Sequence, residues 1–479
     1  MDELKLICLS GPVGLPIIGN VLDVKRLVDK TKFHYLAWEH LAKDYGPVVG
    51  LRLGLAEPLI LVSGRKAVLE MLSRQEFDGR PLGFMFRFRT GGIRRGVIFT
   101  DGQAWTDHRR FALKTLKNFG YGKLTMEDII IRNAVALTKI IDERSKEGPI
   151  DNMRRITSVA VLNNLWTFVT GFSYDLDQKN EKLMDVIDIM DEIVKDSDIC
   201  GGLLNFFPFL RHFIPGPVGF KRHCQRLERL RQFFADEVAE HRETREKEES
   251  RDLIDEYLSI MEKQNLQDST RFDEEQLIAL VKDFFSAGLE TTNNTIGFIL
   301  AYITVNQEVQ QKIHSEIDTV IGKDILPSIS HKSRMHYLNA TIAEVSRLST
   351  VGPTSIPHRA IIDTSFLGFK IKKNYTMLAN LTSVHMDEQY WGDPANFRPE
   401  RFINAEGCYF DDPWLIQFGI GRRRCLGENL ARNSLFLFLT CLLQKFNFQL
   451  TPNANPSLVG FNGFTISPPQ LNMIVTKRF

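Results

Sequence analysis

The ten residues 418–427, FGIGRRRCLG, constrain the fold of this chain most strongly, because they set one cysteine in a tight and positively charged turn. Three arginines directly precede Cys425, and glycines stand four residues before it and two residues after it. The following stretch, 428–446, is an apolar run with helical spacing and no Gly or Pro, so Cys425 lies just before a helix N-terminus. Nearby guanidinium groups and the positive end of a helix dipole both favour thiolate over thiol. The loop therefore presents an anionic sulfur, a soft ligand that suits iron or copper.

A free cysteine is usually a small buried hydrophobe, and the spacing around Cys425 argues against that interpretation. The pattern F-x-x-G-x-R-x-C-x-G is formed by Phe418, Gly421, Arg423, Cys425 and Gly427, and it resembles the haem-binding loop of the cytochrome P-450 family. The resemblance implies that Cys425 is the axial thiolate ligand of the haem iron. It also implies that Arg423 binds a haem propionate and that Phe418 and Gly427 lie against the haem, which glycine permits because it has no side chain.

Composition and charge exclude several other classes of protein. With 60 basic and 59 acidic residues the net charge is +1, so there is no electrostatic case for binding nucleic acid. The six cysteines are scattered without a CxxC pair or a Cys/His cluster of zinc spacing, and their density is too low for a disulfide scaffold. A chain of 479 residues, 43% of them hydrophobic, is long enough to bury a large core.

The N-terminal segment lacks a run of about 20 apolar residues, the length that a membrane-spanning helix needs. The Gly- and Pro-containing residues 11–20 resemble the segment that directly follows the membrane anchor in microsomal members of the family. We therefore expect residues 1–20 to be a truncated N-terminal segment without an anchor helix, and residues 21–479 to form a single catalytic domain.

Two irregular segments stand out in the first half of the chain. Residues 77–99 are rich in aromatics, Gly and Arg, which predicts a binding loop or lid. Residues 201–219 carry several phenylalanines and three prolines, and they either pack internally or contact a membrane. In microsomal members this region dips into the bilayer beside the substrate entrance, so the resemblance implies peripheral membrane contact.

A W-x-x-x-R motif places Trp105 and Arg109 four residues apart on one face of an expected helix. The resemblance implies that both side chains donate hydrogen bonds to a haem propionate, a carboxylate that Arg can bind bidentately. The basic residues around the motif form either a solvated face or a docking surface for an acidic electron donor. The residues assigned to this basic surface are Arg110, Lys114, Lys117, Arg422 and Arg424.

Residues 272–309 predict a long helix whose centre reads AGLETT. Ala287 and Gly288 leave space for a large group against the helix, at a cost in helix propensity. The Thr291 hydroxyl can bond back to the carbonyl of Ala287. The motif also resembles the family's oxygen-activation motif, which implies a helix locally opened over the haem and a contact of Ala287 with it. Glu290 and Thr291 are then the catalytic residues that relay protons.

A buried charge cluster is expected to support the haem loop. Glu344 and Arg347 are three residues apart on an expected helix and make a natural ion pair. Arg401, in the sequence PERF, resembles the third member of the family's Glu-Arg-Arg cluster. We assign these three residues to folding, because breaking a buried ion pair typically costs about 3–5 kcal/mol.

The residues that follow the Glu344 helix should run extended because of two prolines. His358, in this segment, resembles the family position that contacts a propionate, although a lone histidine is more often simply hydrogen-bonded. Residues 455–468 look like a hairpin whose aromatics belong to the core or line a pocket. The side chains expected to line the substrate pocket are Phe284, Ala287, Thr354, Ile356 and Phe464.

The resemblance covers nearly the whole chain in the family's order, and it implies a mainly α fold with a minor β-rich part. Haem b, iron protoporphyrin IX, would lie between the long central helix and the helix that follows Cys425. The implied activity is that of a monooxygenase that takes O₂ and NADPH electrons through NADPH–cytochrome P-450 reductase, or from a cytochrome b-type donor. The implied location is the cytosolic face of the endoplasmic reticulum membrane.

Two other functions remain open from the residues alone. A haem-thiolate isomerase or dehydratase would rearrange a peroxide without O₂ or a reductase, and a non-catalytic haem- or ligand-binding protein would turn nothing over. The intact AGLETT motif and the basic surface favour the monooxygenase. The stretch 287–298 is similar to insect members near the methyl farnesoate epoxidases, so the expected substrate is an apolar small molecule, namely a sesquiterpenoid hormone precursor, a steroid or a xenobiotic, that is hydroxylated or epoxidised.

Overall fold

A computed structural model describes residues 10–196, 199–246, 249–263, 272–454 and 456–479. The α-helices are α1 (Val21–Thr31), α2 (His34–Tyr45), α3 (Arg65–Ser73), α4 (Phe84–Phe88), α5 (Gly102–Asn118), α6 (Leu124–Glu147), α7 (Met153–Thr170), α8 (Glu181–Asp196), α9 (Gly202–Phe206), α10 (Leu210–Phe213), α11 (Phe220–Thr244), α12 (Leu253–Lys263), α13 (Glu274–Val305), α14 (Gln307–Val320), α15 (His336–Ser349), α16 (Thr382–His385), α17 (Glu388–Trp391) and α18 (Glu428–Lys445). The strands are β1 (Val48–Leu51), β2 (Leu59–Val62), β3 (His358–Arg359), β4 (Thr364–Phe366), β5 (Phe369–Ile371), β6 (Thr376–Ala379), β7 (Phe446–Leu450) and β8 (Met473–Lys477). Short 3₁₀ helices are η1 (Gln75–Phe77), η2 (Ile329–Arg334), η3 (Pro399–Phe402) and η4 (Gly421–Arg423). The expected mainly α fold with a minor β-rich part is confirmed.

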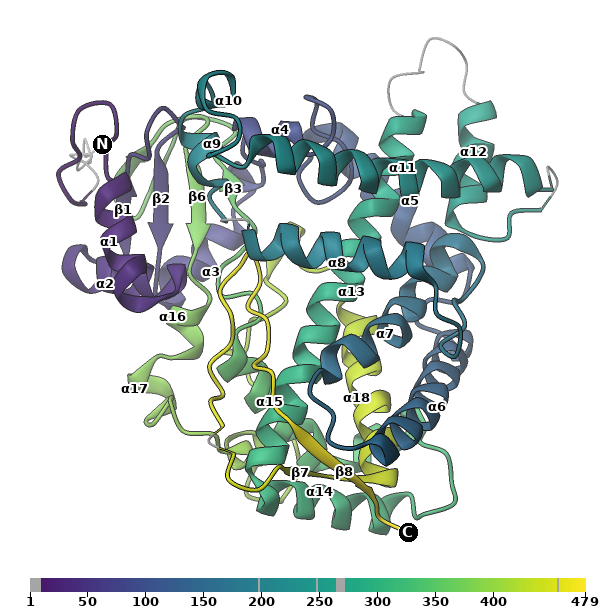
Figure 1. Ribbon diagram of the computed structural model, residues 1–479. Helices are drawn as coiled ribbons and strands as arrows, with labels where there is room; N and C mark the ends of the chain where they lie inside the picture. Colours follow the sequence, from purple (N-terminus) through teal and green to yellow (C-terminus); the bar gives the residue numbers. More distant parts are fainter. Residues whose placement is uncertain (1–9, 197–198, 247–248, 264–271, 455) are drawn as a thin grey trace.

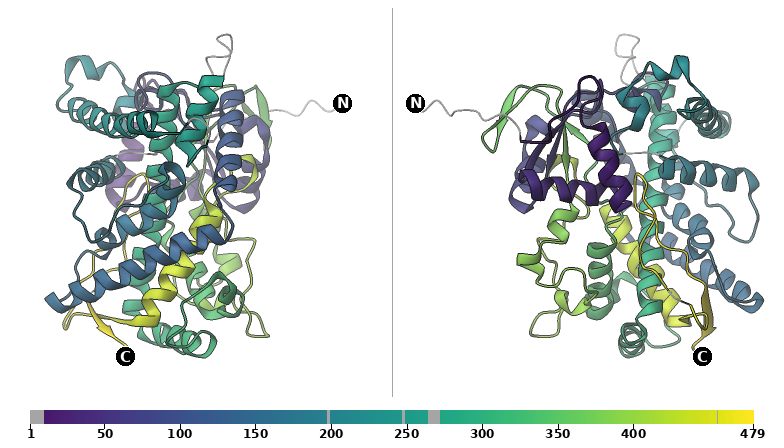
Figure 2. Two further views of the ribbon diagram at one scale, coloured as in Figure 1. Left: turned by 90° about the vertical axis from the view of Figure 1, so that its right-hand side faces the viewer. Right: turned by 60° about the vertical axis from the view of Figure 1, so that its left-hand side comes forward.

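The long helix α13 is the centre of the helical part. Its N-terminus is capped by Asp273, whose carboxylate accepts a hydrogen bond of 2.7 Å from the Gln276 N–H, and Glu274 and Glu275 in the first turn suit the helix dipole. Nearly every face of α13 is buried, because α7, α11, α15 and α18 all contact it. Figures 1 and 2 show it running through the middle of the molecule, with α18 beside it. A helix that is apolar all round belongs in a core.

The β-rich part is a four-stranded sheet in the order β1-β2-β6-β3. The sheet begins with a hairpin, in which β1 and β2 pair antiparallel with Val48 opposite Val62. Strand β6, some 300 residues away in sequence, pairs parallel with β2, and β3 pairs antiparallel with β6. Figure 1 shows the sheet to one side of the helices, with α1 and α2 next to it. This pairing brings the segment that carries His358 beside the N-terminal part of the chain.

His241, at the end of α11, links three helices. Its Nδ1 lies 2.8 Å from the carbonyl oxygen of Glu237, and its Nε2 lies 3.1 Å from the carbonyl oxygen of Thr170 and 3.2 Å from Asp252 Oδ2. Because both ring nitrogens face acceptors, both carry protons and the ring is an imidazolium. Burial opposes this charge, but the hydrogen bond to Asp252 and its negative charge raise the pKa of His241 to about 9.

Several segment boundaries differ from the expectations. The expected helix 272–309 ends at Val305, and α14 begins after Asn306. The loop 77–99 contains the short helix α4, and 201–219 contains α9 and α10. In 456–468, the described part of the expected C-terminal hairpin, Phe461 pairs with Ser467 as an isolated bridge and forms no named strand; Asn455 lies outside the described residues. No helix in the described ranges is both long and apolar enough to cross a bilayer.

Candidate active site

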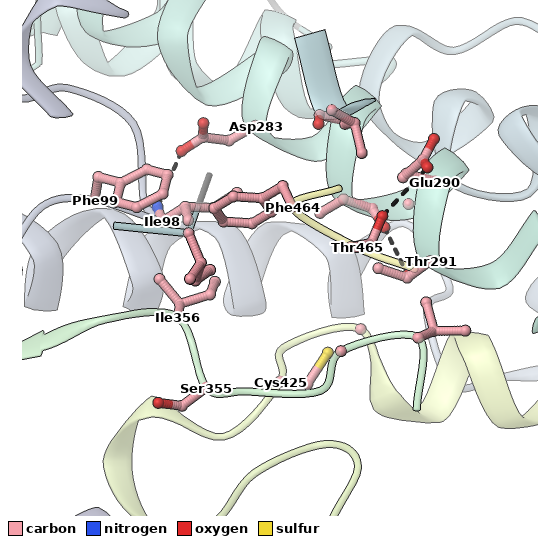
Figure 3. A pocket seen from close by; sticks show the side chains of 18 of the residues that line it. Ile98, Phe99, Asp283, Glu290, Thr291, Ser355, Ile356, Cys425, Phe464 and Thr465 are labelled. Carbon is pink, nitrogen blue, oxygen red and sulfur yellow. Dashed lines mark hydrogen bonds between the residues drawn. The ribbon is translucent and has the colours of Figure 1, made fainter. Parts of the chain in front are cut away.

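One cavity of about 670 Å³ collects the residues that the sequence assigned to cofactor and substrate. It is lined by α5, α13, the Cys425 loop, the segment before β3 and the C-terminal segment. The predicted residues that line it are Trp105, Arg109, Phe284, Ala287, Glu290, Thr291, Thr354, Ile356, His358, Phe418, Arg423, Cys425, Gly427 and Phe464. Figure 3 shows the sulfur of Cys425 facing this space, with Thr291 and Phe464 on its other side.

The Cys425 loop turns sharply before α18. Gly421 has a φ of +71°, and a Cβ at this position would lie only 2.2 Å from the carbonyl oxygen of Leu72 in α3, so glycine is required here. The Cys425 N–H donates to the Phe418 carbonyl at 2.9 Å. Helix α18 begins at Glu428, three residues after the cysteine. The expected position of Cys425 just before a helix N-terminus is confirmed.

The protonation of Cys425 differs from the expectation that nearby arginines make it a thiolate. The Cys425 side chain is exposed to the cavity, but desolvation by the surrounding protein raises the pKa of its thiol. This outweighs the Gly427 N–H, Arg109 and Arg424, which act to lower that pKa. Arg424 is engaged by Glu428, with its Nε 2.6 Å from Oε2, so part of its charge is neutralised. The protein alone therefore favours the thiol, and a coordinated metal cation would remove its proton.

The space beside the sulfur is open at Gly427. A Cβ on this residue would point toward the sulfur, at 4.0 Å from Cys425 Sγ, and would meet no nearer protein atom. The φ of Gly427 is −91°, a value open to any residue. Nothing in the protein itself requires glycine here, so the missing side chain leaves room for a group that lies against the loop.

Three arginines surround the ring of Trp105 at one end of the cavity. The guanidinium carbons of Arg423, Arg422 and Arg109 lie 3.8, 5.3 and 5.7 Å from the ring centroid. Arg423 donates to the carbonyl oxygens of Asp78 and Thr100, but its Nη1 is buried and has no hydrogen-bond partner among the described residues. A buried charged donor without an acceptor is costly, and an anionic ligand would satisfy it.

Positive charge exceeds negative charge around this end of the cavity. The arginines gathered here are Arg80, Arg94, Arg109, Arg359, Arg422 and Arg423, and the carboxylates that pair with them within the described ranges belong to Asp78 and Asp101. Arg80 is fully enclosed and binds three backbone carbonyl oxygens; burial and the nearby Arg423 hold its pKa well below its usual value. The group therefore suits a ligand with two carboxylates, which is the number of propionates on haem b.

His358 lies in the same group and is buried. Its Nδ1 is 2.7 Å from the carbonyl oxygen of Phe77, so Nδ1 carries the proton. Burial, together with Arg80 and Arg423, holds the pKa of His358 well below its usual value. The ring is therefore neutral in the protein alone, and a nearby carboxylate would favour its protonation.

On α13, Ala287 and Gly288 both line the cavity. A Cβ on Gly288 would lie 2.6 Å from a methyl carbon of Leu165 in α7, so close helix packing also favours glycine here. The Thr291 hydroxyl donates to the Ala287 carbonyl at 2.9 Å, as the alternative interpretation predicted. The helix is continuous from Glu274 to Val305, so the expected local opening is absent from this described helix.

Glu290 is held by partners that the sequence did not single out. Arg154 of α7 donates from Nη2 to Glu290 Oε2 at 2.7 Å and also pairs with Asp191 of α8. Asn294 donates to Glu290 Oε1 at 2.9 Å, and the Thr465 hydroxyl approaches the same oxygen at 3.3 Å. Burial raises the pKa of Glu290, while Arg154 acts to lower it. Figure 3 shows Glu290 and Thr465 facing each other beside Thr291.

The expected charge cluster behind the Cys425 loop is present. Arg347 donates to both oxygens of Glu344 at 2.8 Å, and Arg401 Nε lies 3.2 Å from Glu344 Oε1. The cluster reaches the loop through His385, whose carbonyl accepts from Arg347 and whose Nε2 accepts from the Ile416 N–H. These contacts agree with a structural position for the three charged residues.

Four of the five residues assigned to the basic surface lie together in the structure. Arg110, Lys114, Lys117 and Arg422 line a shallow hollow over Trp105 and Arg109. Arg424 does not line this hollow; it lies at the surface, where its Nε and Nη2 donate to Glu428.

Two aromatic residues that lie near the predicted pocket residues in sequence do not line the cavity. Phe461 is 53% exposed, and Phe285 is packed against Trp166 and Phe234 in the core. Phe464 and Phe99 do line the cavity, with ring centroids 6.3 Å apart.

Comparison with known proteins identifies the class of protein to which this fold and cavity belong. The sequence model of the cytochrome P450 family matches residues 9–475, and the chain therefore belongs to this family of haem-dependent oxygenases. It is 38% identical to the farnesoate epoxidase of Bombyx mori over 98% of this chain and 93% of that protein. It is also 38% identical to the probable cytochrome P450 305a1 of Drosophila melanogaster, over 98% and 94% of the two chains. Cytochrome P450 2J2 of Homo sapiens is 35% identical over 96% and 89%.

Membership of the family makes the chain a monooxygenase with a haem cofactor. The residues present fit that cofactor on structural grounds. A cysteine sulfur faces the cavity, glycine leaves the space beside it open, and an excess of arginines with an unpartnered donor lies where carboxylates could bind. The family also implies a redox partner and an apolar substrate.

Proposed function

We propose that this chain is a monooxygenase that receives NADPH electrons through a reductase, or from a cytochrome b-type donor, and inserts one oxygen atom of O₂ into an apolar small molecule. The observation that supports this most is a single cavity in which Cys425 and the Ala287–Thr291 turn of α13 face the same space. In this proposal the whole of 21–479 acts as one catalytic domain.

Haem bound through the Cys425 thiolate would supply the activation of O₂. Around it, Phe418, Gly427 and Ala287 provide the surfaces of the slot. Four further cavity residues would donate hydrogen bonds to the propionates, namely Trp105, Arg109, His358 and Arg423. Binding of the propionates would give Arg423 Nη1 the acceptor that it lacks and would stabilise the charged form of His358.

Glu290 and Thr291 are proposed to supply protons to the cavity. Glu290 has its pKa raised by burial, so its protonated form is more accessible than that of a surface carboxyl. For a proton to move, the Thr291 hydroxyl must turn away from the Ala287 carbonyl that it now contacts. Arg154 and Asn294 keep the Glu290 carboxyl in place and act as positioning residues.

The redox partner is proposed to dock on the basic surface formed by Arg110, Lys114, Lys117 and Arg422. This hollow lies directly over Trp105 and Arg109, so a donor bound there would sit close to the cofactor end of the cavity. Acidic groups on the donor would be steered to it by charge.

A membrane contact is proposed where the N-terminal segment lies beside strand β1 of the sheet. The exposed apolar side chains there are Val13, Leu15, Ile17, Leu55, Leu203, Phe209, Phe213 and Ile214. Residues 54–55 contact Phe206 of α9, and Figure 1 shows α9 and α10 near the same sheet as the N-terminal helix α1. An apolar patch of this kind marks membrane or protein contact, and it agrees with a location on the cytosolic face of the endoplasmic reticulum.

The substrate is proposed to be a sesquiterpenoid, with steroids and xenobiotics as the next candidates. The similarity to a farnesoate epoxidase supports this order. Phe284, Thr354, Ile356 and Phe464 line the cavity and would form the apolar part of the substrate pocket.

Two measurements test the proposal. The carbon monoxide difference spectrum of the reduced protein should show the red-shifted band of a thiolate-ligated haem, and Cys425→Ser should abolish or move it; an unchanged band would place the ligand elsewhere. With reductase and a bound sesquiterpenoid, Thr291→Ala should consume NADPH with less product formed per NADPH. Unchanged coupling would rule out the proton role, and turnover of a lipid hydroperoxide without NADPH would favour an isomerase.

A further inference from the structure

Lys282 of α13 is a buried lysine that lines the cavity without a carboxylate partner. It is 9% exposed, and its Nζ donates to the carbonyl oxygen of Arg89 at 2.7 Å. An ammonium group has three donors, and within the described ranges this carbonyl is the acceptor found for it. Buried charges are normally paired, so the position calls for an explanation.

The carboxylates closest in sequence cannot serve as its partner. Asp283 binds Arg89 with one oxygen, and its other oxygen accepts from the N–H groups of Val97 and Ile98 at 2.8 and 2.9 Å. Glu275, two turns earlier on α13, is paired with Arg231. Burial, with a contribution from the positive charge of Arg89, lowers the pKa of Lys282 to about 7.

Arg89 adds a second unsatisfied donor to the same wall. Its guanidinium lies over the ring of Phe99, 4.9 Å from the centroid, and one of its nitrogens, Nη1, is buried without a hydrogen-bond partner among the described residues. Both Arg89 and Phe99 line the cavity. The Arg89–Asp283 pair is neutral as a unit, so a protonated Lys282 leaves one uncompensated positive charge there.

The other ionisable groups at this end do not cancel that charge. His223 of α11 also lines the cavity, and burial lowers its pKa to about 4, so it is neutral near pH 7. Arg222 and Arg226 pair with Asp196, and Arg226 also pairs with Glu192. These four side chains balance one another. The cavity therefore has a cationic corner at Lys282 and Arg89, in addition to the arginines gathered around Trp105.

We propose that Lys282 and Arg89 form an anchor for the carboxylate of the substrate, and that this chain therefore selects an apolar monocarboxylic acid over the corresponding ester. The inference rests on the proposed function, since it names the substrate class of the same cavity. A carboxylate would give Lys282 its counter-ion and Arg89 Nη1 its acceptor. An ester has no charge and meets neither need.

The position of the anchor also predicts which end of the substrate is oxidised. Lys282 precedes Ala287 by five residues and Thr291 by nine, or roughly 7 and 14 Å along a helix axis. Figure 3 shows Phe464 lying between Asp283, the neighbour of Lys282, and Thr291. The acid group would thus be held away from the oxygen-activation site, and an apolar tail would extend past Phe464 toward it.

Equilibrium binding to the haem-loaded protein tests the anchor. Farnesoic acid and methyl farnesoate are titrated by calorimetry into the wild type and into Lys282→Met, which keeps the length of the side chain and removes the charge. We expect the acid to bind at least tenfold more weakly to the variant and the ester to change less than threefold. Equal losses for both ligands, or no loss for the acid, would overturn the proposal and leave Lys282 as a structural contact to Arg89.

Lys332 offers a matched control. It is another largely buried lysine with a neutral partner, Asn433 Oδ1 at 3.1 Å, and burial lowers its pKa to about 8, but it does not line the cavity. Lys332→Met should leave the affinities for both ligands unchanged. The same tenfold loss in this variant would mean that any buried lysine matters and would refute a local anchor.

The pH dependence provides a second readout. The acid needs a protonated Lys282, so its affinity for the wild type should fall up to tenfold per pH unit above about 7, while the ester shows no such trend. The groups that face Lys282 are Arg89, Asp283, Glu275 and His223, and the pKa of about 4 of His223 places its titration below this range. A flat profile for the acid would contradict the anchor. These binding measurements involve no turnover. The anchor can therefore be confirmed even if oxygenation with the reductase fails, and it can be refuted even if oxygenation succeeds.

Discussion

Replacing Glu344 by Gln should destabilise the protein strongly, because this carboxylate lies between the buried guanidinium groups of Arg347 and Arg401. Arg347 binds both oxygens at 2.8 Å, Arg401 Nε lies 3.2 Å from Oε1, and the Arg398 N–H donates to the same oxygen at 3.0 Å. The side chains of Glu344 and Arg347 are fully buried, and that of Arg401 is 4% exposed. Gln removes the charge and turns an N–H₂ group toward donors that need an acceptor.

The magnitude follows from the loss of one member of a buried ionic cluster, which costs about 3–5 kcal/mol. Against a total free energy of unfolding of about 5–15 kcal/mol, that is a large fraction. The damage should reach the Cys425 loop, because Arg347 also holds the His385 carbonyl and His385 accepts from the N–H of Ile416. Urea unfolding followed by far-ultraviolet circular dichroism measures the stability, and the fraction of haem retained at low urea reports on the loop.

Glu400→Gln is the matched control. Glu400 directly precedes Arg401, its side chain is 46% exposed, and it binds Lys312 and the hydroxyl of Tyr337. An exposed pair of this kind contributes at most about 1 kcal/mol. If Glu344→Gln loses no more stability than Glu400→Gln, the reasoning from burial is refuted.

Two further predictions concern buried charges elsewhere. His241→Gln should lower the free energy of unfolding by on the order of 3 kcal/mol at pH 6. The folded pKa of about 9 lies above the ordinary value of 6.5, so the charged ring stabilises the fold below pH 6.5, and this stabilisation is lost as the pH rises through 9. Urea unfolding at pH 6 and 9.5 should show the difference in stability from the wild type shrinking, and a constant difference would contradict the prediction. Arg154→Met should move the alkaline limb of the pH profile of coupled turnover to higher pH, because Arg154 lowers the pKa of Glu290. Arg154→Lys keeps the positive charge and should keep the wild-type pH profile. An identical pH profile in all three proteins would show that Glu290 does not supply protons.

The fold class and the membership of the cavity could be predicted because the chain carries the family's motifs in the family's order, and some of these motifs have a local structural cause. Gly421 is an example. Its backbone conformation and its approach to Leu72 both require glycine, so this structural requirement appears in the sequence as a glycine four residues before Cys425. The apolar run after the cysteine likewise forms α18 where expected.

Protonation states and partners from other elements could not be predicted in the same way. The arginines before Cys425 suggested a thiolate, but desolvation of the sulfur by the protein around the cavity arises only in the folded chain, and it raises the pKa of the thiol. Arg154 lies in a stretch that reads only as helical, and its contact with Glu290 spans 136 residues. Gly288 was interpreted as space for a ligand, and it does line the cavity, but its contact with Leu165, which also favours a residue without a side chain, was not visible in the sequence.

Lys282 and Glu290 are eight residues apart on α13, about 12 Å along the axis and a little more than two turns, so one rigid helix carries a cation toward one end of the cavity and an acid toward the other. Their networks are separate: Lys282 contacts the Arg89 carbonyl, and Glu290 contacts Arg154, Asn294 and Thr465. Sites without shared partners at this distance act nearly additively. A change at Lys282 should therefore alter which substrate binds without altering how many NADPH are used per product, whereas a change at Arg154 should do the opposite.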